Sequence, residues 1–246
     1  MSQKGYSIVT GGSRRIGAAL CEQLAAEGYD VLVNYSASKG RAEEVANRIN
    51  QQYGVKAAIF QANVKEYEQV EAMRDFAKET FGDDLSVLVN NAGLDYLKPF
   101  LDLTPAEYEN IIDVDYIGTL NCCHVFGPML IERKKGNVIT IASTAAFRAA
   151  PHAAYCGAKA AQVAFNRQLA VEWGPHGIRC NVIAPGYTIT EASEAVGPQI
   201  LEMVRNQSPL KVVGTVEDMK LALSYLLSAE KMTGTTISPN CGVFSF

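Results

Sequence analysis

Short runs of apolar residues alternate along the chain with longer segments in which apolar residues recur every three or four positions. The runs predict buried strands, and the longer segments predict helices with one apolar face. The expected strands cover 6–10, 31–35, 57–62, 87–89, 138–143, 178–184 and 235–238. The expected helices cover 20–25, 42–51, 70–77, 104–129, 153–173 and 216–228. This alternation predicts an α/β protein with a parallel sheet, right-handed crossovers and helices on both faces.

Composition limits the class of protein. The chain has 246 residues, of which 48% are hydrophobic and 20% charged, which is typical of a soluble globular protein. We find no repeat or linker and expect one domain over residues 1–246. The net charge of -4 gives no reason to expect nucleic acid or a membrane surface as a partner. Because residues 1–5 lead directly into a strand-like run, without a long apolar segment, we expect a cytoplasmic protein.

The six cysteines are scattered, and their spacing is not that of metal ligands, so no metal site is predicted. Five of them have apolar or small neighbours and are expected to be reduced thiols of the core. Cys156 differs because it follows Tyr155, although a structural role is still expected for it.

A glycine-rich turn separates the first strand from the first helix. Strand, turn and helix in this order predict a phosphate site, because the turn presents backbone N–H groups at the positive end of a helix dipole. The candidate cofactor-binding residues of this turn are Gly11, Ser13, Arg14, Arg15, Ile16 and Gly17. An ordinary loop is the alternative, but the second strand at 31–35 completes a unit of the length that dinucleotides require.

The end of the second strand indicates which dinucleotide is bound. A carboxylate at this position would accept hydrogen bonds from the ribose 2′-hydroxyl and repel a 2′-phosphate. The chain instead has Tyr35 and Ser36 there, and Arg14 faces them from the glycine turn. We therefore expect NADP(H) rather than NAD(H) as the cofactor. The alternative is that these polar residues are loop residues that face water.

Two later strand ends are also expected at the cofactor, because ligands of such sheets lie beyond the carboxyl ends of the strands. Asn63 and Val64 follow the third strand, and the segment that contains Asn90, Ala92 and Gly93 follows the fourth.

Tyr155 and Lys159 are the leading candidates for catalysis. They are four residues apart on an expected helix, so the phenol and the ammonium should be neighbours on one face. A nearby cation should lower the pKa of the tyrosine and make it a general acid, and the lysine can also bind a ribose. Ser143 ends the preceding strand and can hydrogen-bond a developing alkoxide. The alternative is a solvated helical pair, a pattern that many helices contain by chance.

Two further segments bear on the substrate and on assembly. Residues 187–213 form a long excursion that we interpret as a lid over the site, and 94–98 and 147–150 should also determine substrate choice. The expected helix 104–129 has more apolar positions than one core face needs. Either a second subunit or a wide internal face would account for them.

Taken together, these motifs resemble the short-chain dehydrogenase/reductase family, most nearly its 3-oxoacyl-acyl-carrier-protein reductase type. The resemblance covers the whole chain, from Thr10–Gly17 to the tail at 232–242. It implies a Rossmann-type doubly wound domain with a seven-stranded parallel sheet, and a homotetramer or homodimer. It also implies that Ser143, Tyr155 and Lys159 are catalytic. The cofactor contacts that it adds are Tyr155, Lys159, Pro185, Gly186, Thr188 and Thr190.

The chain departs from the family pattern at two positions. Arg15 replaces the middle glycine of the turn, as in pteridine reductases. Asp115 stands where the family usually has an asparagine that supports a proton relay to the lysine. An ionised Asp115 should hold Lys159 charged and weaken its effect on Tyr155, so Asp115 is added to the catalytic candidates.

The sequence therefore predicts an NADPH-dependent oxidoreductase that transfers a hydride between nicotinamide and a carbonyl or secondary alcohol. A ketone or 3-oxoacyl-type compound is the expected small-molecule substrate, and Tyr155 is the expected general acid/base. Arg15 leaves a pteridine or other ring-reducing enzyme as an alternative, and Asp115 leaves a catalytically impaired NADP-binding sensor. The identity of the substrate and the direction of reaction stay open.

Overall fold

Seven parallel strands form the central sheet of the computed structural model, which describes residues 4–150, 152–191 and 197–245. Their order across the sheet is β3-β2-β1-β4-β5-β6-β9. The strands are β1 (Tyr6–Val9), β2 (Asp30–Tyr35), β3 (Ala57–Gln61), β4 (Leu85–Asn90), β5 (Gly136–Ile141), β6 (Ile178–Ile183) and β9 (Thr236–Ile237). The predicted doubly wound, Rossmann-type fold is thereby confirmed.

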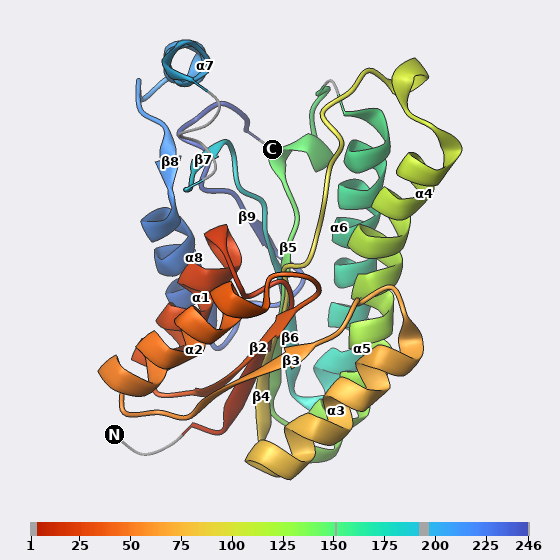
Figure 1. The fold of residues 1–246 in the computed structure, drawn as a ribbon, viewed down its shortest axis with the longest axis vertical. Helices are drawn as coiled ribbons and strands as arrows, with labels where there is room; N and C mark the ends of the chain where they lie inside the picture. Colours follow the sequence, from red (N-terminus) through yellow and green to blue (C-terminus); the bar gives the residue numbers. More distant parts are fainter. Residues whose placement is uncertain (1–3, 151, 192–196, 246) are drawn as a thin grey trace.

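Helices cover both faces of this sheet (Figure 1). One face carries α1 (Arg15–Ala26), α2 (Lys39–Gln52) and α8 (Val216–Ser228). The other carries α3 (Tyr67–Phe81), α5 (Gly118–Arg133) and α6 (Ala153–Trp173). Because both faces are covered, every residue of β1, β2 and β4 is buried, which explains their continuous apolar runs.

The order of the strands also fixes where a ligand can bind. The chain moves outward from β1 through β2 to β3, and then returns to β4 on the other side of β1. At such a reversal the loops after neighbouring strands diverge and leave a crevice beyond the carboxyl ends. The loops that follow β1 and β4 meet at this point.

The long helix expected over 104–129 is interrupted in the structure. It begins with a capping box in which Thr104 and Glu107 bond each other's backbone N–H groups. It ends as α4 (Pro105–Ile112), passes through a π-helical segment (Asp113–Ile117), and continues as α5. The expectation of one regular helix was therefore wrong. One inserted residue leaves both flanking segments amphipathic, so the apolar pattern gives no separate signal for a π turn. Such turns often mark functional sites, and this one contains the buried Asp115.

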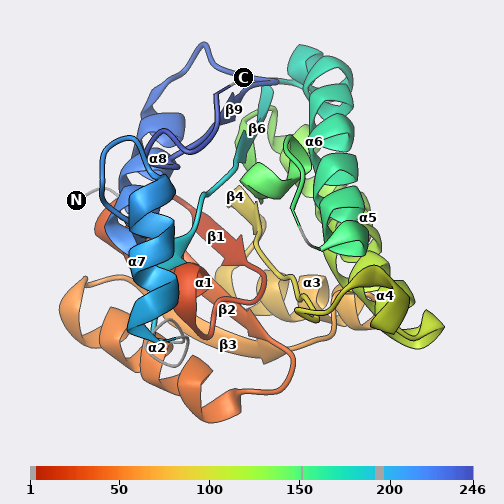
Figure 2. The same ribbon diagram turned by 90° about the horizontal axis from the view of Figure 1, so that it is seen from above.

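The excursion after β6 lies beyond the carboxyl ends of the strands, as both views show (Figures 1 and 2). It contains β7 (Thr188–Ile189), α7 (Pro198–Gln207) and β8 (Gly214–Thr215), and β7 pairs with β8. Residues 192–196 of the predicted lid lie outside the described residues. The described residues also contain three short 3-10 helices, at Phe100–Asp102 (η1), Thr144–Ala146 (η3) and Gly174–His176 (η4).

The cysteines agree with most of the prediction. All six are free, and Cys21, Cys122, Cys123 and Cys180 are buried. Cys241 is half-buried in the C-terminal tail, so the expectation of a core thiol was wrong for it. Within the described residues, no helix has both the length and the apolar character needed to cross a bilayer.

Candidate active site

The turn between β1 and α1 is built so that its backbone can approach a ligand. Gly11 has a φ of +61°, a value that side chains disfavour. A Cβ atom at Gly17, in the first turn of α1, would collide with the carbonyl oxygen of Gly11, so this residue must lack a side chain. In the described part of the chain, no side chain caps the first N–H groups of α1. The turn therefore presents backbone N–H groups without side-chain partners at a helix N-terminus, and such groups can donate hydrogen bonds to the phosphates of a dinucleotide.

Two asparagines, one from the end of β2 and one from the segment after β4, hold this turn in place from either side of β1. The Asn34 side chain accepts a hydrogen bond from the N–H of Gly11 (3.2 Å) and donates to the carbonyl oxygen of Ala62 (3.0 Å). The Asn91 amide donates to the carbonyl oxygens of Thr10 (2.9 Å) and Gly11 (3.2 Å). Sequence analysis singled out neither residue for this role, although both stand at strand ends next to predicted contacts.

Arg15 begins α1 with a φ of +53°. It occupies the position at which the resembled family has a glycine, and its left-handed backbone shows why a glycine suits that position. For an L residue this conformation costs about 1–2 kcal/mol. The exposed Arg15 side chain is thus kept on a strained backbone at the mouth of the phosphate turn.

Three arginines lie close together at this end of the sheet. Burial lowers the pKa of Arg14, and the charges of Arg15 and Arg41 lower it further, whereas Glu191 raises it. Arg41 belongs to the first turn of α2, and its guanidinium lies 3.7 Å from the Glu191 carboxylate. Sequence analysis missed Arg41. The sequence did contain a signal for it, because Arg41 is a basic residue in the helix that follows β2, close to the predicted 2′-phosphate position.

The other predicted cofactor contacts differ in how they are placed. Ser36 is exposed directly after β2, whereas Tyr35 packs into the core and is 5% exposed. Asn63 is half-buried and accepts a hydrogen bond from the N–H of Lys65 (3.4 Å). Val64 is buried against α5, where a Cβ at Gly118 would lie 2.4 Å from it. For these residues, contact with a cofactor stays a prediction.

The turn after β4 also mixes core and site residues. The Asn90 side chain points into the core, 3.3 Å from the sulfur of Cys123. The N–H of Ala92 donates to the Thr10 hydroxyl (3.0 Å), which ties this turn to the end of β1. A Cβ at Gly93 would lie 2.7 Å from Asp115 Oδ1, so a side chain here would displace that carboxylate.

The end of β6 completes the same edge of the sheet. The Pro185 carbonyl accepts a hydrogen bond from the N–H of Thr144 (2.9 Å), and the Gly186 N–H donates to Pro239 (3.1 Å). The Thr188 hydroxyl donates to the Gly186 carbonyl (3.2 Å). Thr190 follows β7 on the same excursion. All four predicted contacts, Pro185, Gly186, Thr188 and Thr190, therefore leave the sheet at its carboxyl edge.

The structure brings the predicted catalytic residues together. Tyr155 and Lys159 lie on one face of α6, with the ammonium 5.5 Å from the centre of the phenol ring. Ser143 lies two residues after β5 and caps η3, where its hydroxyl accepts a hydrogen bond from the N–H of Ala145 (3.1 Å). The same hydroxyl is near enough to the phenol of Tyr155 to act on its pKa, against the larger effect of burial. The Lys159 ammonium also donates to the carbonyl oxygen of Ile141 (3.0 Å). The expected i,i+4 pair is therefore present, with the serine beside it.

Asp115 forms a buried ion pair with Lys159. The carboxylate Oδ1 lies 3.0 Å from the ammonium, and the two side chains are 0% and 5% exposed. Its Oδ2 accepts a hydrogen bond from the N–H of Leu94 (2.9 Å). Burial alone would lower the pKa of Lys159, but the charges of Asp115 and Tyr155 outweigh it, and the pKa is raised. Asp115 thus holds the lysine in its charged form.

The pKa of Tyr155 contradicts the expectation from the sequence. Burial raises it, Lys159 lowers it only in part, and the negative charge of Asp115 raises it again. The predicted net lowering was therefore wrong. The main reason is that the phenol is buried, and a second is that a carboxylate balances the cation beside it; the i,i+4 spacing alone reports neither.

The sheet, the uncapped turn and the Tyr155–Lys159 pair together define a dinucleotide-dependent oxidoreductase. A family model described as enoyl-(acyl carrier protein) reductase matches residues 11–243. The chain is 34% identical over 241 residues to the 3-oxoacyl-[acyl-carrier-protein] reductase FabG of Staphylococcus aureus, with 97% of each chain covered. It is 33% identical over 242 residues to 3beta-hydroxysteroid dehydrogenase 1 of Eggerthella lenta, with 96% of this chain and 92% of the relative covered.

A solved short chain dehydrogenase from Burkholderia cenocepacia, in complex with NADP, is 29% identical and has a TM-score of 0.89, with 98% of each chain covered. These matches show that the chain belongs to the short-chain dehydrogenase/reductase family. It is an oxidoreductase that acts on CH–OH and C=O groups.

Replacing Arg15 by glycine should raise the free energy of unfolding of the cofactor-free protein. Relief of the left-handed strain outweighs the extra backbone freedom of glycine in the unfolded chain, for a net gain of about 0.5–1 kcal/mol. Urea unfolding of the wild-type protein, Arg15→Gly and Arg15→Ala measures the effect. Arg15→Ala is the matched control, since it removes the guanidinium but keeps the strain. An equal gain in both variants would mean that charge repulsion, and not backbone strain, is relieved.

Proposed function

We propose that this protein is an NADPH-dependent carbonyl reductase, with a ketone or 3-oxoacyl-type compound as substrate and Tyr155 as the general acid. The observation that carries this proposal is the grouping of the Tyr155 phenol, the Ser143 hydroxyl and the Lys159 ammonium at the carboxyl edge of the sheet. The proposed reaction would take place between the turn after β4 and the first turn of α6, from which these side chains come. The FabG and hydroxysteroid dehydrogenase relatives support this class of substrate.

Each residue of the group has a separate task in ketone reduction. A bound NADPH would supply the hydride to the carbonyl carbon. The Ser143 hydroxyl is a donor for the carbonyl oxygen as negative charge develops on it. Tyr155 gives its proton to that oxygen, and its raised pKa keeps the phenol protonated before the transfer. Lys159, held charged by Asp115, stabilises the phenolate that remains.

The preference for NADPH rests on the arginine cluster. Arg14, Arg15 and Arg41 are close enough for their charges to interact, Arg41 belongs to the helix that follows β2, and no carboxylate follows that strand directly. These arginines are our candidates for binding an adenosine 2′-phosphate. Guanidinium groups bind phosphate by short, charge-assisted hydrogen bonds. The solved relative in complex with NADP supports the same cofactor. Glu191, which pairs with Arg41, would compete with the phosphate for that guanidinium.

Replacing Tyr155 by phenylalanine should nearly eliminate ketone turnover, whereas NADPH should still bind, because the glycine turn and the arginines are unchanged. We expect kcat to fall by about 10²–10⁴, the usual contribution of a positioned general acid. NADPH consumption is measured with β-ketoacyl thioesters, cyclic ketones, quinones and pterins, and Tyr225→Phe on α8 is the matched control. Reduction of pterin rings without any ketone turnover would favour the ring-reducing alternative. Tight NADPH binding without turnover of any compound would favour the sensor.

Replacing Arg41 by alanine should weaken the use of NADPH and leave that of NADH nearly unchanged. Hydrogen bonds to charged groups contribute about 1.5–3 kcal/mol, so kcat/KM for NADPH should fall roughly 10-fold to 150-fold. The control is Arg48→Ala, the same change two turns later on α2, where the guanidinium pairs with Glu22. An equal loss with both cofactors would show that Arg41 does not bind the 2′-phosphate.

Replacing Asp115 by asparagine should move the pH profile of alcohol oxidation to lower pH. Oxidation needs the Tyr155 phenolate as base, so the rate rises as the pH passes the pKa of Tyr155. Burial is the main cause that raises this pKa, and the negative charge of Asp115 adds to it, so a neutral amide removes part of the rise. The profile is measured beside Asp113→Asn, the same charge change two residues away. A shift to higher pH would show instead that Lys159 loses its proton without Asp115.

A further inference from the structure

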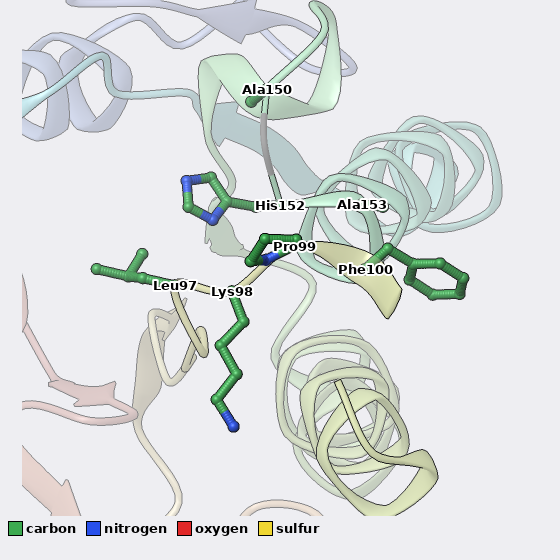
Figure 3. Close-up of a pocket in the computed structure, with 7 residues that line it drawn as sticks. All are labelled: Leu97, Lys98, Pro99, Phe100, Ala150, His152 and Ala153. Carbon is green, nitrogen blue, oxygen red and sulfur yellow. The ribbon is translucent and has the colours of Figure 1, made fainter. Parts of the chain in front are cut away.

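The pocket beside the start of α6 does not contain the catalytic candidates. It has a volume of about 450 Å³ and is lined by residues 97–100 and by Ala150, His152 and Ala153 (Figure 3). Among the described residues that line it, none belongs to the proposed acid/base group. Side chains with contacts to that group lie instead on the buried face of α6.

This buried face is polar over two helical turns. Lys159, Gln162 and Asn166 follow one another on it at helical spacing and are 4%, 0% and 1% exposed. Buried amides usually have partners for both the NH₂ group and the oxygen. The side-chain oxygens of Gln162 and Asn166, however, are buried without a hydrogen-bond partner among the described residues. Since an unpaired buried acceptor is unfavourable, the contribution of each amide to the structure comes from its NH₂ group.

The NH₂ group of Gln162 is bound to the π segment. Its Nε2 donates to the backbone carbonyl oxygen of Asp115 (2.7 Å) and to the hydroxyl oxygen of Thr119 (2.8 Å). The Thr119 hydroxyl in turn donates to the same carbonyl oxygen (2.7 Å). Because a backbone carbonyl can only accept, the Gln162 atom beside it must be the nitrogen and not the oxygen. The three groups therefore form a closed set of hydrogen bonds around one carbonyl.

That carbonyl belongs to the residue whose side chain pairs with the lysine. Oδ1 of Asp115 lies 3.0 Å from the Lys159 ammonium. An α-helix turns by about 100° per residue, so a π segment that relaxed by one residue would rotate this carboxylate away from the ammonium. The side-chain donors at the carbonyl oppose such a change, because they hold the backbone of Asp115 in place.

The charges around the reacting group show how this support reaches the chemistry. Asp115 and Tyr155 raise the pKa of Lys159 against the larger effect of burial. Lys159 lowers the pKa of Tyr155, whereas Asp115 and, to a smaller extent, Asp95 of the turn after β4 raise it. Gln162 has no charge of its own. Within this set, Asp115 is the residue whose backbone Gln162 holds, so an effect of Gln162 on the pH profile must pass through Asp115.

We propose that Gln162 is a positioning residue for the acid/base group. Its amide fixes the π segment and thereby keeps the Asp115 carboxylate beside Lys159. Gln162 acts through Asp115 and not on the substrate. This inference rests on the proposed carbonyl reductase function, in which Tyr155 transfers the proton.

The first test removes the amide without removing its bulk. Gln162→Met keeps a side chain of similar length but cannot donate to the Asp115 carbonyl. We expect the pH profile of alcohol oxidation to shift in the same direction as in Asp115→Asn, because the carboxylate is no longer held beside Lys159 and Tyr155. An unchanged profile would overturn the proposal.

Asn166→Leu is the matched control for this variant. Asn166 lies one turn further along α6 and is as deeply buried, but its amide donates to the Thr140 hydroxyl (3.2 Å) and the Asn181 carbonyl (3.2 Å) instead of the π segment. Its replacement should leave the pH profile unchanged. An equal shift in both variants would mean that any loss of a buried amide on α6 loosens the site, and would count against a specific role of Gln162.

A second pair of variants tests the same carbonyl from its other donor. Thr119→Val removes the hydroxyl at nearly constant volume, whereas Thr119→Ser keeps it. We expect the shift of the pH profile in Thr119→Val and not in Thr119→Ser. This pair decides the question even if Gln162→Met does not fold. Equal profiles for the valine and serine variants would contradict the proposal.

A double variant tests whether Gln162 acts through Asp115. When residues in contact share one effect, their changes are not additive. Adding Gln162→Met to Asp115→Asn should therefore produce no further shift of the pH profile. Shifts that add up would show that Gln162 acts by another route, and the assignment would be wrong.

A readout without turnover separates this inference from the proposed function. The chain has 11 tyrosines, so ¹³C NMR of protein labelled at tyrosine Cζ, assigned with Tyr155→Phe, follows the ionisation of Tyr155 directly. Its titration should shift in Gln162→Met in the direction seen for Asp115→Asn. Turnover with an unchanged titration would overturn the role of Gln162 alone. Absence of turnover with every ketone and alcohol would overturn the proposed function, and the titration would still confirm or overturn the positioning of Asp115 by Gln162.

Discussion

The buried ion pair between Asp115 and Lys159 is the interaction on which the rest of the site depends. It joins four parts of the fold: the π segment, the turn after β4 through Leu94, the end of β5 through Ile141, and α6. Its carboxylate also explains why the neighbouring residue of that turn is Gly93, since a side chain would occupy the same space. Breaking a buried pair by removing one partner typically costs about 3–5 kcal/mol, so this contact holds both the fold and the position of the lysine.

The same pair changes the chemistry at the phenol. A lysine beside a tyrosine favours the phenolate, but a lysine whose charge is balanced by a carboxylate favours it less. Burial of the phenol is the main cause of the raised pKa of Tyr155. The charge of Lys159 lowers this pKa, and the charge of Asp115 raises it again. The π segment makes this possible, because it directs Asp115 into the core beneath the turn after β4. The burial of Asp115, and with it the part of the Tyr155 pKa rise that its charge contributes, therefore follows from one local departure from regular helix.

The sequence predicted the elements that have strong periodicity and clear ends. The helices at Ala153–Trp173 and Val216–Ser228 agree with the structure at both ends, and the sheet follows from the alternation of strand and helix. The meeting of Ser143, Tyr155 and Lys159 also followed, because strand ends share one edge of a parallel sheet. The π segment could not be predicted from the same pattern, since an inserted residue leaves both flanking helices amphipathic. The roles of Arg41, Asn34 and Asn91 depend on contacts between distant segments, which spacing along the chain does not report.

The asparagines that fasten the phosphate turn have a consequence for folding. Asn34 comes from the end of β2 and Asn91 from the segment after β4, so the turn gains its shape only when both strands are paired with β1. The binding site for the dinucleotide is therefore not a preformed local loop but a product of cooperative sheet assembly. Ligand that binds only this assembled state adds RT ln(1 + [L]/Kd) to the free energy of unfolding of the whole sheet. Cofactor occupancy should accordingly protect amides of β2 and β4 from hydrogen exchange together, as one cooperative unit.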